Sequence, residues 1–256
     1  MTFIDPYSWK CLLGAQAKEI KSDNQIYTWK VGKRTHLATS KNLTIQDLPA
    51  LKECSPCNFN YFSKENIDFL KQHFTISTAR DRSVLIPLEN FSLDGGEYKS
   101  TRQMINRAKK YNFSVENNYR KLKDVEDMIE DWSTNYTDKY FRDFSGKNYY
   151  FYKNNFHQDC NNIFLYHQNE LVAYSSLSPH QNGRSAYIIG KALYKKFPGI
   201  SELADVLSFQ KAQQQGATLI DMGQAPKNLL KYKMKYPNAY IEVNYDGKIL
   251  EPLSNS

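Results

Sequence analysis

Residues 185–223 read SAYIIGKALYKKFPGISELADVLSFQKAQQQGATLIDMG, and the order of the apolar runs in this stretch decides the fold. A short, β-prone run over 186–193 is followed by residues 201–215, whose apolar side chains recur at helical spacing without an internal Gly or Pro. Gly216 ends the predicted helix, and a second apolar run occupies 217–222. The pattern predicts two parallel strands that are joined by a crossover helix.

The loop between the first strand and the helix has the composition of a ligand-binding turn. Pro198 and Gly199 allow a tight turn, Ser201 can cap the helix, and two lysines lie near the N–H groups of the first helical turn. Such a loop is suited to an anion or a carbonyl oxygen, as in the donor site of an acyltransferase. An ordinary βαβ unit with a solvated loop is the alternative. The predicted donor-binding residues are Lys195, Lys196, Phe197, Gly199, Ile200 and Ser201.

Composition indicates a globular, basic protein. The chain has 256 residues, 41% of them hydrophobic and 24% charged, which is enough for one large domain or two small lobes. The formal net charge of +7 favours a polyanionic partner, such as RNA, an anionic membrane face or a phosphate-bearing cofactor. The N-terminus lacks the pattern of a secretory signal, and no apolar run is long enough to cross a bilayer. We therefore expect a cytoplasmic protein without a transmembrane segment. We expect no DNA partner.

The cysteines and histidines show no pattern of a metal site or a catalytic nucleophile. The cysteines are scattered, apart from one pair separated by Ser-Pro. A structural zinc site needs a second such pair or two well-spaced histidines, and a thioredoxin-like pair lies where a strand runs into a helix. We interpret Cys11, Cys54, Cys57 and Cys160 as free thiols, expect no metal and no resident cofactor, and assign His157 a structural role.

Strand and helix signals alternate through the rest of the chain. Residues 25–39 alternate apolar and polar side chains around a Gly-Lys turn, which predicts a hairpin. Ser63 can cap a helix. The apolar run over residues 83–88 predicts a buried strand. Two further strands, 163–167 and 170–177, flank a Gln-Asn turn. The alternation predicts an α/β fold.

A basic helix is predicted over residues 99–111. Met104, Ile105 and Ala108 would face inward, whereas the basic side chains stay in water. Such a helix can neutralise several phosphates, and a solvated surface helix is the alternative. The predicted RNA-binding residues are Lys99, Arg102, Arg107, Lys109 and Lys110.

Three blocks of the sequence resemble one known family and occur in the expected order. The first runs from Val84-Leu-Ile-Pro-Leu through a Gly-Gly pair into the basic helix, and the second is the strand Glu170-Leu-Val-Ala-Tyr. The third is Gly216-Ala-Thr-Leu-Ile-Asp-Met-Gly-Gln-Ala-Pro with the following Leu-Lys-Tyr-Lys-Met-Lys-Tyr-Pro. Together they resemble the C-terminal catalytic domain of phosphatidylglycerol lysyltransferases and related uncharacterised GNAT-like proteins, and more distantly the Fem-type aminoacyltransferases.

The resemblance implies an α/β fold of two GNAT-like lobes, each a mixed sheet flanked by helices. We assign residues 1–120 to the N-terminal lobe and 121–256 to the C-terminal lobe, which would hold the active site. The resemblance also implies transfer of an acyl group, in the best-known members an aminoacyl group from aminoacyl-tRNA. We therefore expect an acyltransferase with tRNA as a partner and with an amine or hydroxyl of a small molecule or peptide as the acceptor.

One strand departs from the pattern of the lipid-modifying members of this family. Those members carry an acidic residue and an arginine in the strand where this chain has Tyr187, Gly190 and Lys191. The departure argues against a lipid acceptor. The lysine-rich segment near the C-terminus does match, with Lys233 and Lys235 at the expected positions.

These features support direct transfer without a covalent enzyme intermediate. The acceptor attacks the carbonyl of a bound ester or thioester, whose oxygen is polarised by backbone N–H groups and a lysine. Asp221 can orient or deprotonate the acceptor, and Tyr187 can donate a proton to the leaving hydroxyl. Lys191, Lys233 and Lys235 can stabilise negative charge. The structural alternatives are a turn cap for Asp221, a core position for Tyr187 and solvated surface positions for the lysines.

Two other classes of protein remain open. An acetyl-CoA or acyl-CoA dependent N-acyltransferase would share the fold, but residues 195–201 match the usual pyrophosphate-loop pattern of that class poorly. A non-catalytic binding protein with a degenerate acyltransferase fold is the third hypothesis. Incubation with charged tRNA and with labelled acetyl-CoA would distinguish the three classes.

Overall fold

The computed structural model describes residues 17–23, 25–39, 41–134, 151–153, 155, 157–180, 182–224 and 227–253. Cys11 lies outside these residues. The chain forms two compact units, one made of Met1–Ser83 with Ile241–Ser256 and the other of Val84–Tyr240. Within the described ranges, no helix is both long and apolar enough to cross a membrane.

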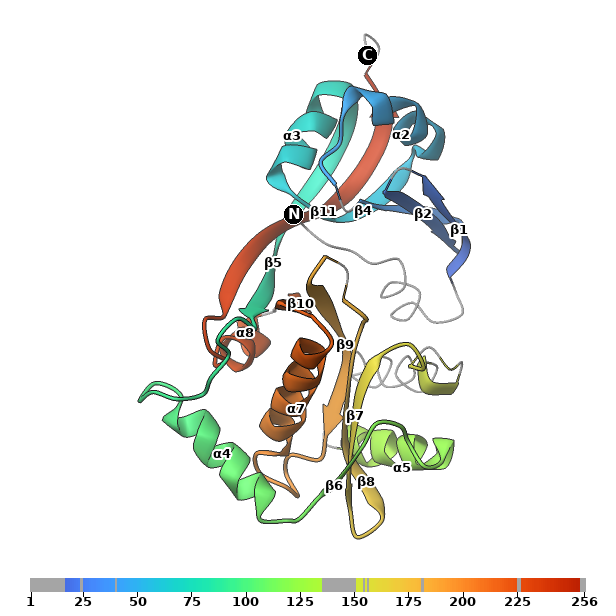
Figure 1. Ribbon diagram of the computed structural model, residues 1–256. Coiled ribbons are helices and arrows are strands. Elements are labelled where there is room, and N and C mark those ends of the chain that lie inside the picture. The colour runs from blue at the N-terminus through green and yellow to red at the C-terminus, as the bar shows by residue number, and fades with distance from the viewer. Residues whose placement is uncertain are drawn as a thin grey trace. The chain divides into compact units, whose positions relative to one another are not determined.

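The first unit is an open sheet covered by short helices (Figure 1). Its strand order is β1-β2-β3-β4-β11-β5, in which β3 and β4 are parallel and β4 and β11 are antiparallel. Leu37, Phe59, Phe62 and Leu70 form a fully buried core between the sheet and the helices. The elements are β1 (Ala17–Asp23), β2 (Ile26–Val31), β3 (Arg34–Thr39), η2 (Ile45–Asp47), α2 (Leu48–Cys54), β4 (Cys57–Phe62), α3 (Lys64–His73), β5 (Phe74–Pro87) and β11 (Tyr240–Pro252).

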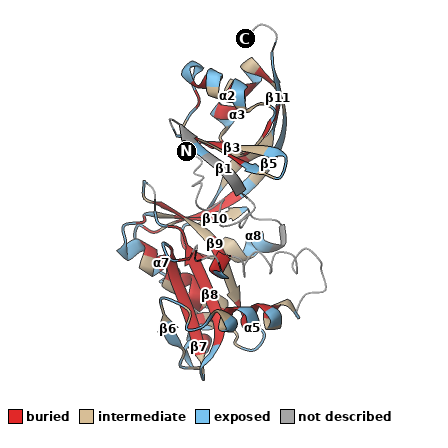
Figure 2. Ribbon diagram, turned by 90° about the vertical axis from the view of Figure 1, so that its right-hand side faces the viewer, coloured by how far each residue is buried: buried red, intermediate tan, exposed pale blue. Residues whose placement is uncertain are grey.

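The second unit is a mixed sheet with helices on both faces. Its strand order is β5-β10-β9-β8-β7-β6, and helices α7 and α5 lie on opposite faces (Figure 1). The buried residues gather on the central strands and on the side of α7 that faces them (Figure 2). The elements are α4 (Lys99–Lys109), β6 (Ser114–Glu116), α5 (Leu122–Ser133), β7 (Asn161–His167), β8 (Glu170–Leu177), β9 (Arg184–Ala192), α7 (Ile200–Gln214), β10 (Leu219–Gln224) and α8 (Lys227–Lys233).

The division into units differs from the boundary expected at residue 120. Helix α4 packs against α7, and β6 pairs with β7, so the segment after Val84 belongs with the C-terminal unit. The chain passes from one unit to the other within β5 and returns to the first unit along β11. A sequence gives no local sign of this return, because a strand has the same pattern whichever sheet it joins.

The predicted local structure is confirmed at several turns and caps. The hairpin turn at Gly32 has a φ of 60°, and strands β2 and β3 pair on either side of it. Ser63 accepts a hydrogen bond from the N–H of Asn66 and so caps α3. Gln168 and Asn169 both have positive φ, as a tight hairpin between β7 and β8 requires.

The central βαβ unit is also confirmed. Strands β9 and β10 are parallel, and α7 connects them. Gly216 has a φ of 95° directly after the helix, a conformation that an L side chain rarely adopts. The predicted cap at Ser201 is wrong by two residues, because the helix is capped by Gly199, which has a φ of 89°.

Candidate active site

The two parallel strands of the central unit separate at their C-terminal ends. They pair over three residues each, and the last pair is Ala186 with Asp221. Beyond that pair β9 continues to Ala192 and β10 to Gln224, without pairing to each other. Since α7 starts after the C-terminal end of β9, the strands separate at the end of the sheet where the helix N-terminus lies.

A β-bulge occurs on β9 at this point. Tyr187 pairs with Leu177 of β8 and Ile189 pairs with Ser176, so Ile188 is an extra residue without a partner in the ladder. A bulge redirects the local backbone groups, and bulges are frequent beside active sites. The backbone at Ile188 is thus the first part of β9 that is released from both neighbouring strands.

Next to the bulge, a buried carboxylate holds three tyrosine hydroxyls. Asp205 of α7 is 2% exposed, and its oxygens accept hydrogen bonds from Tyr187 at 2.8 Å, Tyr232 at 2.7 Å and Tyr236 at 2.6 Å. A Cβ atom at Gly190 would lie 1.8 Å from the Tyr187 hydroxyl. The glycine therefore leaves the space that this hydroxyl occupies.

Burial sets the ionisation of this cluster. Burial raises the pKa of the Asp205 carboxyl, and the three hydroxyl donors oppose that rise. Burial, followed by the nearby charge of Asp205, raises the pKa of Tyr187 and of Tyr232 well above the usual value. The tyrosines consequently remain protonated at neutral pH, as hydrogen-bond and proton donors must be.

Lys235 lies beside the cluster. Its ammonium forms an ion pair with Glu202 of α7 at 2.7 Å and sits 3.4 Å from the centre of the Tyr232 ring. Burial lowers the pKa of Lys235, and Glu202 opposes that shift. The predicted residues Tyr187 and Lys235 are thus brought together through Tyr232 and Asp205.

Lys233 lies at the end of β10. Its Nζ donates to the backbone carbonyls of Met222 at 2.5 Å, Gly223 at 3.3 Å and Gln224 at 2.5 Å. Helix α8 ends at Lys233, and Lys235 lies in the following turn, so the helix covers only part of the lysine-rich segment. Lys233 therefore supports the strand end at which β10 leaves β9.

Asp221 is buried, and each of its two carboxylate oxygens accepts a hydrogen bond. Its Oδ2 accepts from Arg184 at 2.7 Å, in an ion pair between two buried side chains, and its Oδ1 accepts from the N–H of Gly223 at 2.8 Å. The second contact is the turn cap that was the structural alternative for this residue. As the last paired residue of β10, Asp221 nevertheless lies where the two strands separate.

Lys191 lies on the other face of the sheet from the Asp205 cluster. Its Nζ is 4.2 Å from the centre of the Trp132 ring of α5, whereas the Tyr187 hydroxyl reaches α7 across Gly190. Burial lowers the pKa of Lys191 to about 8. The structure therefore does not bring Lys191 together with Tyr187 and Lys235.

The predicted donor loop is partly a packing element. A Cβ atom at Gly199 would lie 1.9 Å from the backbone carbonyl oxygen of Met104, so α4 packs directly on the start of α7. Ile200 is fully buried. Phe197 packs among the rings of Tyr111 and His167, with ring centroids 5.1 Å apart in both cases.

The polar residues of this loop remain accessible. Lys195 and Lys196 are exposed and Ser201 is half-buried. Lys196 forms an ion pair with Asp131 of α5 at 2.6 Å. Of the predicted donor-binding residues, these three have side chains that a ligand can reach, together with the partly buried Phe197.

Helix α4 and its C-cap residue, Lys110, carry the predicted basic residues, with no acidic residue among them. Lys99, Arg107, Lys109 and Lys110 are exposed, as expected for phosphate contacts. Arg102 differs, because its guanidinium donates to the backbone carbonyls of Leu93 and, at 2.6 Å, of Gly95. Arg102 thus holds the loop before the helix.

The residues that organise the site were not among those predicted from the sequence. Asp205 and Glu202 were not predicted, although a carboxylate at Asp205 falls within the apolar stripe of the predicted helix. A charged residue in an apolar stripe is rarely buried without partners, so this position was a detectable signal. Its partners, Tyr232 and Tyr236, are distant in sequence and gave no such sign.

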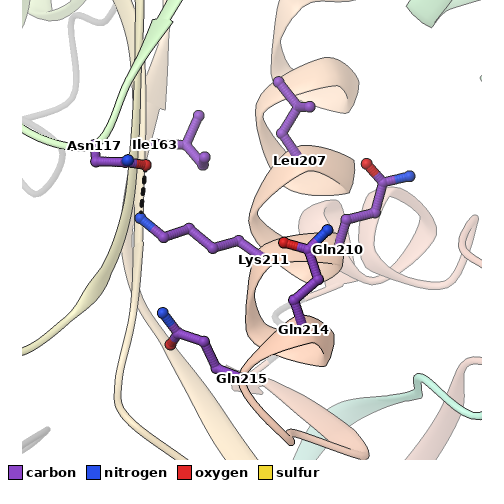
Figure 3. Close-up of a pocket in the computed structure, with 7 residues that line it drawn as sticks. All are labelled: Asn117, Ile163, Leu207, Gln210, Lys211, Gln214 and Gln215. Atoms are coloured by element: carbon purple, nitrogen blue, oxygen red, sulfur yellow. Dashed lines mark hydrogen bonds between the residues drawn. The ribbon is translucent and has the colours of Figure 1, made fainter.

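A pocket of about 340 Å³ lies elsewhere, at the C-terminal half of α7 (Figure 3). Lys211 points across it, and its Nζ donates to Asn117 at 2.8 Å and to the carbonyl of Asn162 at 2.9 Å. None of the predicted site residues lines it. The lining residues are Asn117, Ile163, Leu207, Gln210, Lys211, Gln214 and Gln215.

A mixed sheet whose central parallel strands separate beside the start of their crossover helix is the fold of GNAT-like acyltransferases. The comparisons agree: residues 50–239 match the family described as phosphatidylglycerol lysyltransferase, C-terminal, and the chain belongs to that family. No curated protein matches the chain.

Solved structures with this fold share little sequence with the chain. L-PGS from Bacillus licheniformis is 17% identical with a TM-score of 0.67, over 93% of this chain and 86% of that one. FemX is 13% identical with a TM-score of 0.59, over 95% and 91% of the two chains. A GNAT-family acetyltransferase from Colwellia psychrerythraea is 7% identical with a TM-score of 0.51, over 92% and 84%. Related lysyltransferases, Fem transferases and acetyltransferases thus share one acyltransferase fold.

Proposed function

We propose that the chain transfers an aminoacyl group from aminoacyl-tRNA to an amine or hydroxyl of a small molecule or peptide. The observation that carries the proposal is the separation of β9 from β10 beside the Asp205 cluster, in a member of this family. The separated strands leave the backbone of the bulge at Ile188 without a ladder partner. The carbonyl group of the donor ester can bind to this backbone, in the position that a neighbouring strand would otherwise take.

The chemistry in this opening is direct attack. The acceptor attacks the ester carbonyl, and a backbone N–H at the bulge stabilises the oxyanion, supported by the positive charge of Lys233 at the end of β10. The Tyr187 hydroxyl, which donates to Asp205 before the reaction, turns to give this proton to the leaving ribose oxygen, and the proton that the acceptor releases returns to Tyr187. Asp221 orients the acceptor at the last paired position of β10. The step needs no covalent enzyme intermediate.

The basic helix supports tRNA as the donor rather than a small thioester. Helix α4 packs against the start of α7 at Gly199, so its exposed cations lie next to the loop that we assign to the donor. Phosphates of an acceptor stem can bind Arg107, Lys109 and Lys110 while the 3′ end reaches the opening. Binding of an acyl-CoA donor would not require a basic surface of this length.

The proposal is tested by offering both donors. A pool of labelled aminoacyl-tRNA and labelled acetyl-CoA are incubated in parallel with the protein and an amine acceptor mixture, and loss of label from each donor is measured. We expect protein-dependent loss from aminoacyl-tRNA only. Loss from acetyl-CoA alone would assign the chain to the N-acyltransferases, and loss from neither would favour a binding protein.

A salt titration tests the role of α4. Replacing Arg107, Lys109 and Lys110 by Gln should reduce the slope of log affinity for tRNA against log salt by about 2–3, as expected for three lost phosphate contacts. Arg102 is left unchanged, because it holds the preceding loop. The matched control replaces three exposed cations of the first unit, Lys71, Arg80 and Lys248, by Gln. Equal slopes for the two triple variants would contradict a tRNA site on α4.

A further inference from the structure

Two cysteine side chains of the first unit lie in contact. Cys54 is the last residue of α2 and Cys57 the first residue of β4, and their sulfur atoms are 3.7 Å apart. A disulfide has a sulfur–sulfur distance of about 2.05 Å, so side-chain rotation of both residues has to close the remaining gap. Both were predicted to be free thiols, and both are in the thiol form in the structure.

The two thiols differ in exposure and in acidity. Cys57 is 5% exposed and lies in the core, whereas Cys54 is partly exposed. The hydrogen bond from Cys57 lowers the pKa of the Cys54 thiol, and the same contact together with burial raises the pKa of Cys57. This asymmetry is that of an attacking and a resolving thiol.

The order of elements around the two cysteines is the reverse of that in thioredoxin-like motifs: a helix leads into a strand. Cys54 is at the C-terminal end of a helix, and the negative end of the helix dipole does not stabilise its thiolate. A thiol pair whose reduced form is not stabilised by a helix N-terminus favours the disulfide more strongly. We therefore expect this pair to favour the disulfide more strongly than a thioredoxin-like pair does.

We infer that Cys54 and Cys57 form a reversible disulfide by exchange with a small-molecule disulfide such as oxidised glutathione. The Cys54 thiolate attacks one sulfur of the glutathione disulfide, and one glutathione leaves as thiolate. Cys57 then attacks the Cys54 sulfur of the mixed disulfide and releases the second glutathione. Two electrons pass from the cysteine pair to glutathione, and the two thiol protons end on the two glutathione molecules.

The test uses mass spectrometry on the full chain. The protein is incubated with oxidised glutathione, its remaining thiols are alkylated, and the tryptic peptide 53–64, which contains both cysteines, is weighed. We expect this peptide to lose two hydrogens relative to the dithiol and to regain them with dithiothreitol. A peptide that remains fully reduced, or one that keeps a glutathione without closing the ring, would overturn the inference.

Two variants separate the roles of the cysteines. Cys57→Ser should accumulate the glutathione adduct on Cys54, because no resolving thiol remains. Cys160→Ser, in the second unit, should leave the oxidation of peptide 53–64 unchanged and serves as the control. If Cys57→Ser does not fold, the wild-type protein still decides: Cys54 should be alkylated at least about tenfold faster than Cys57. Equal alkylation rates would contradict the assignment of Cys54 as the attacking thiol.

Discussion

The buried carboxylate of Asp205 should be the most sensitive polar position of the second unit. Asp205→Asn preserves the shape of the side chain but replaces one of the two acceptor oxygens by a donor. Oδ2 accepts from both Tyr232 and Tyr236, so the amide oxygen of the variant is best placed there. The amide nitrogen then faces the hydroxyl of Tyr187, which loses its acceptor.

The magnitude follows from these contacts. A hydrogen bond to a charged group contributes about 1.5–3 kcal/mol, and one is lost outright. The two that remain fall to roughly half strength, because they are no longer charge-assisted. Relief from burying a charge offsets part of this loss. We expect the free energy of unfolding to decrease by about 3 kcal/mol, which corresponds to a decrease in Tm of roughly 6–12 °C.

Calorimetry of the variant and a matched control provides the test. Asp131→Asn removes a carboxylate from a partly exposed ion pair with Lys196 and should cost under about 1 kcal/mol. A double-mutant cycle between Asp205→Asn and Tyr187→Phe should give a coupling energy of at least about 1 kcal/mol, since both remove the same hydrogen bond. A decrease in Tm for Asp205→Asn no larger than that for Asp131→Asn would refute the reasoning.

Two further predictions concern lysines. Burial lowers the pKa of Lys191 to about 8 from the ordinary 10.5, so the native protein releases this proton before the unfolded chain does and its stability rises with pH across that interval. In Lys191→Met the rise should be smaller by roughly 3 kcal/mol between neutral pH and about pH 10.5, measured by urea unfolding, and an unchanged rise would show that Lys191 is not the group that titrates. Lys233→Ala should lower the rate of transfer by about 10–100-fold and Lys235→Ala by much less, because Lys233 lies at the separated end of β10 and Lys235 is paired with Glu202. Equal small effects of the two substitutions on the rate would show that neither lysine takes part in the transfer step.

Local signals were sufficient to predict much of the fold. The hairpin around Gly32, the cap at Ser63 and the parallel pair joined by α7 each depend on turn chemistry and periodicity within a short stretch. The unit boundary was not predictable in this way. It depends on the return of β11 to the first sheet and on the close approach of Met104 to Gly199, which are contacts between residues far apart in the sequence.

The candidate site was predictable to a lesser extent. Tyr187, Lys191, Asp221, Lys233 and Lys235 were predicted from the sequence, and the structure brings Tyr187 and Lys235 to one cluster. Lys191 was predicted at the same site. The bulge at Ile188 instead puts its side chain on the face of the sheet that α5 covers. A bulge moves every following side chain to the opposite face of the sheet, and the sequence of this strand does not predict a bulge.

Tyr187 and Gly190, two of the positions on β9 at which the sequence departs from the lipid-modifying pattern, are coupled in the structure. The hydroxyl of Tyr187 fills the space above Gly190, so a side chain at position 190 would displace the hydroxyl from Asp205. A protein that had merely lost its chemistry would gain stability by replacing the buried carboxylate with an apolar side chain, since burial of a charge is costly even when it is well bonded. This chain instead surrounds Asp205 with three donors and places Lys235 on the ring of one of them. The cost of that arrangement is understandable if the cluster orients Tyr187 for transfer to an acceptor other than a lipid.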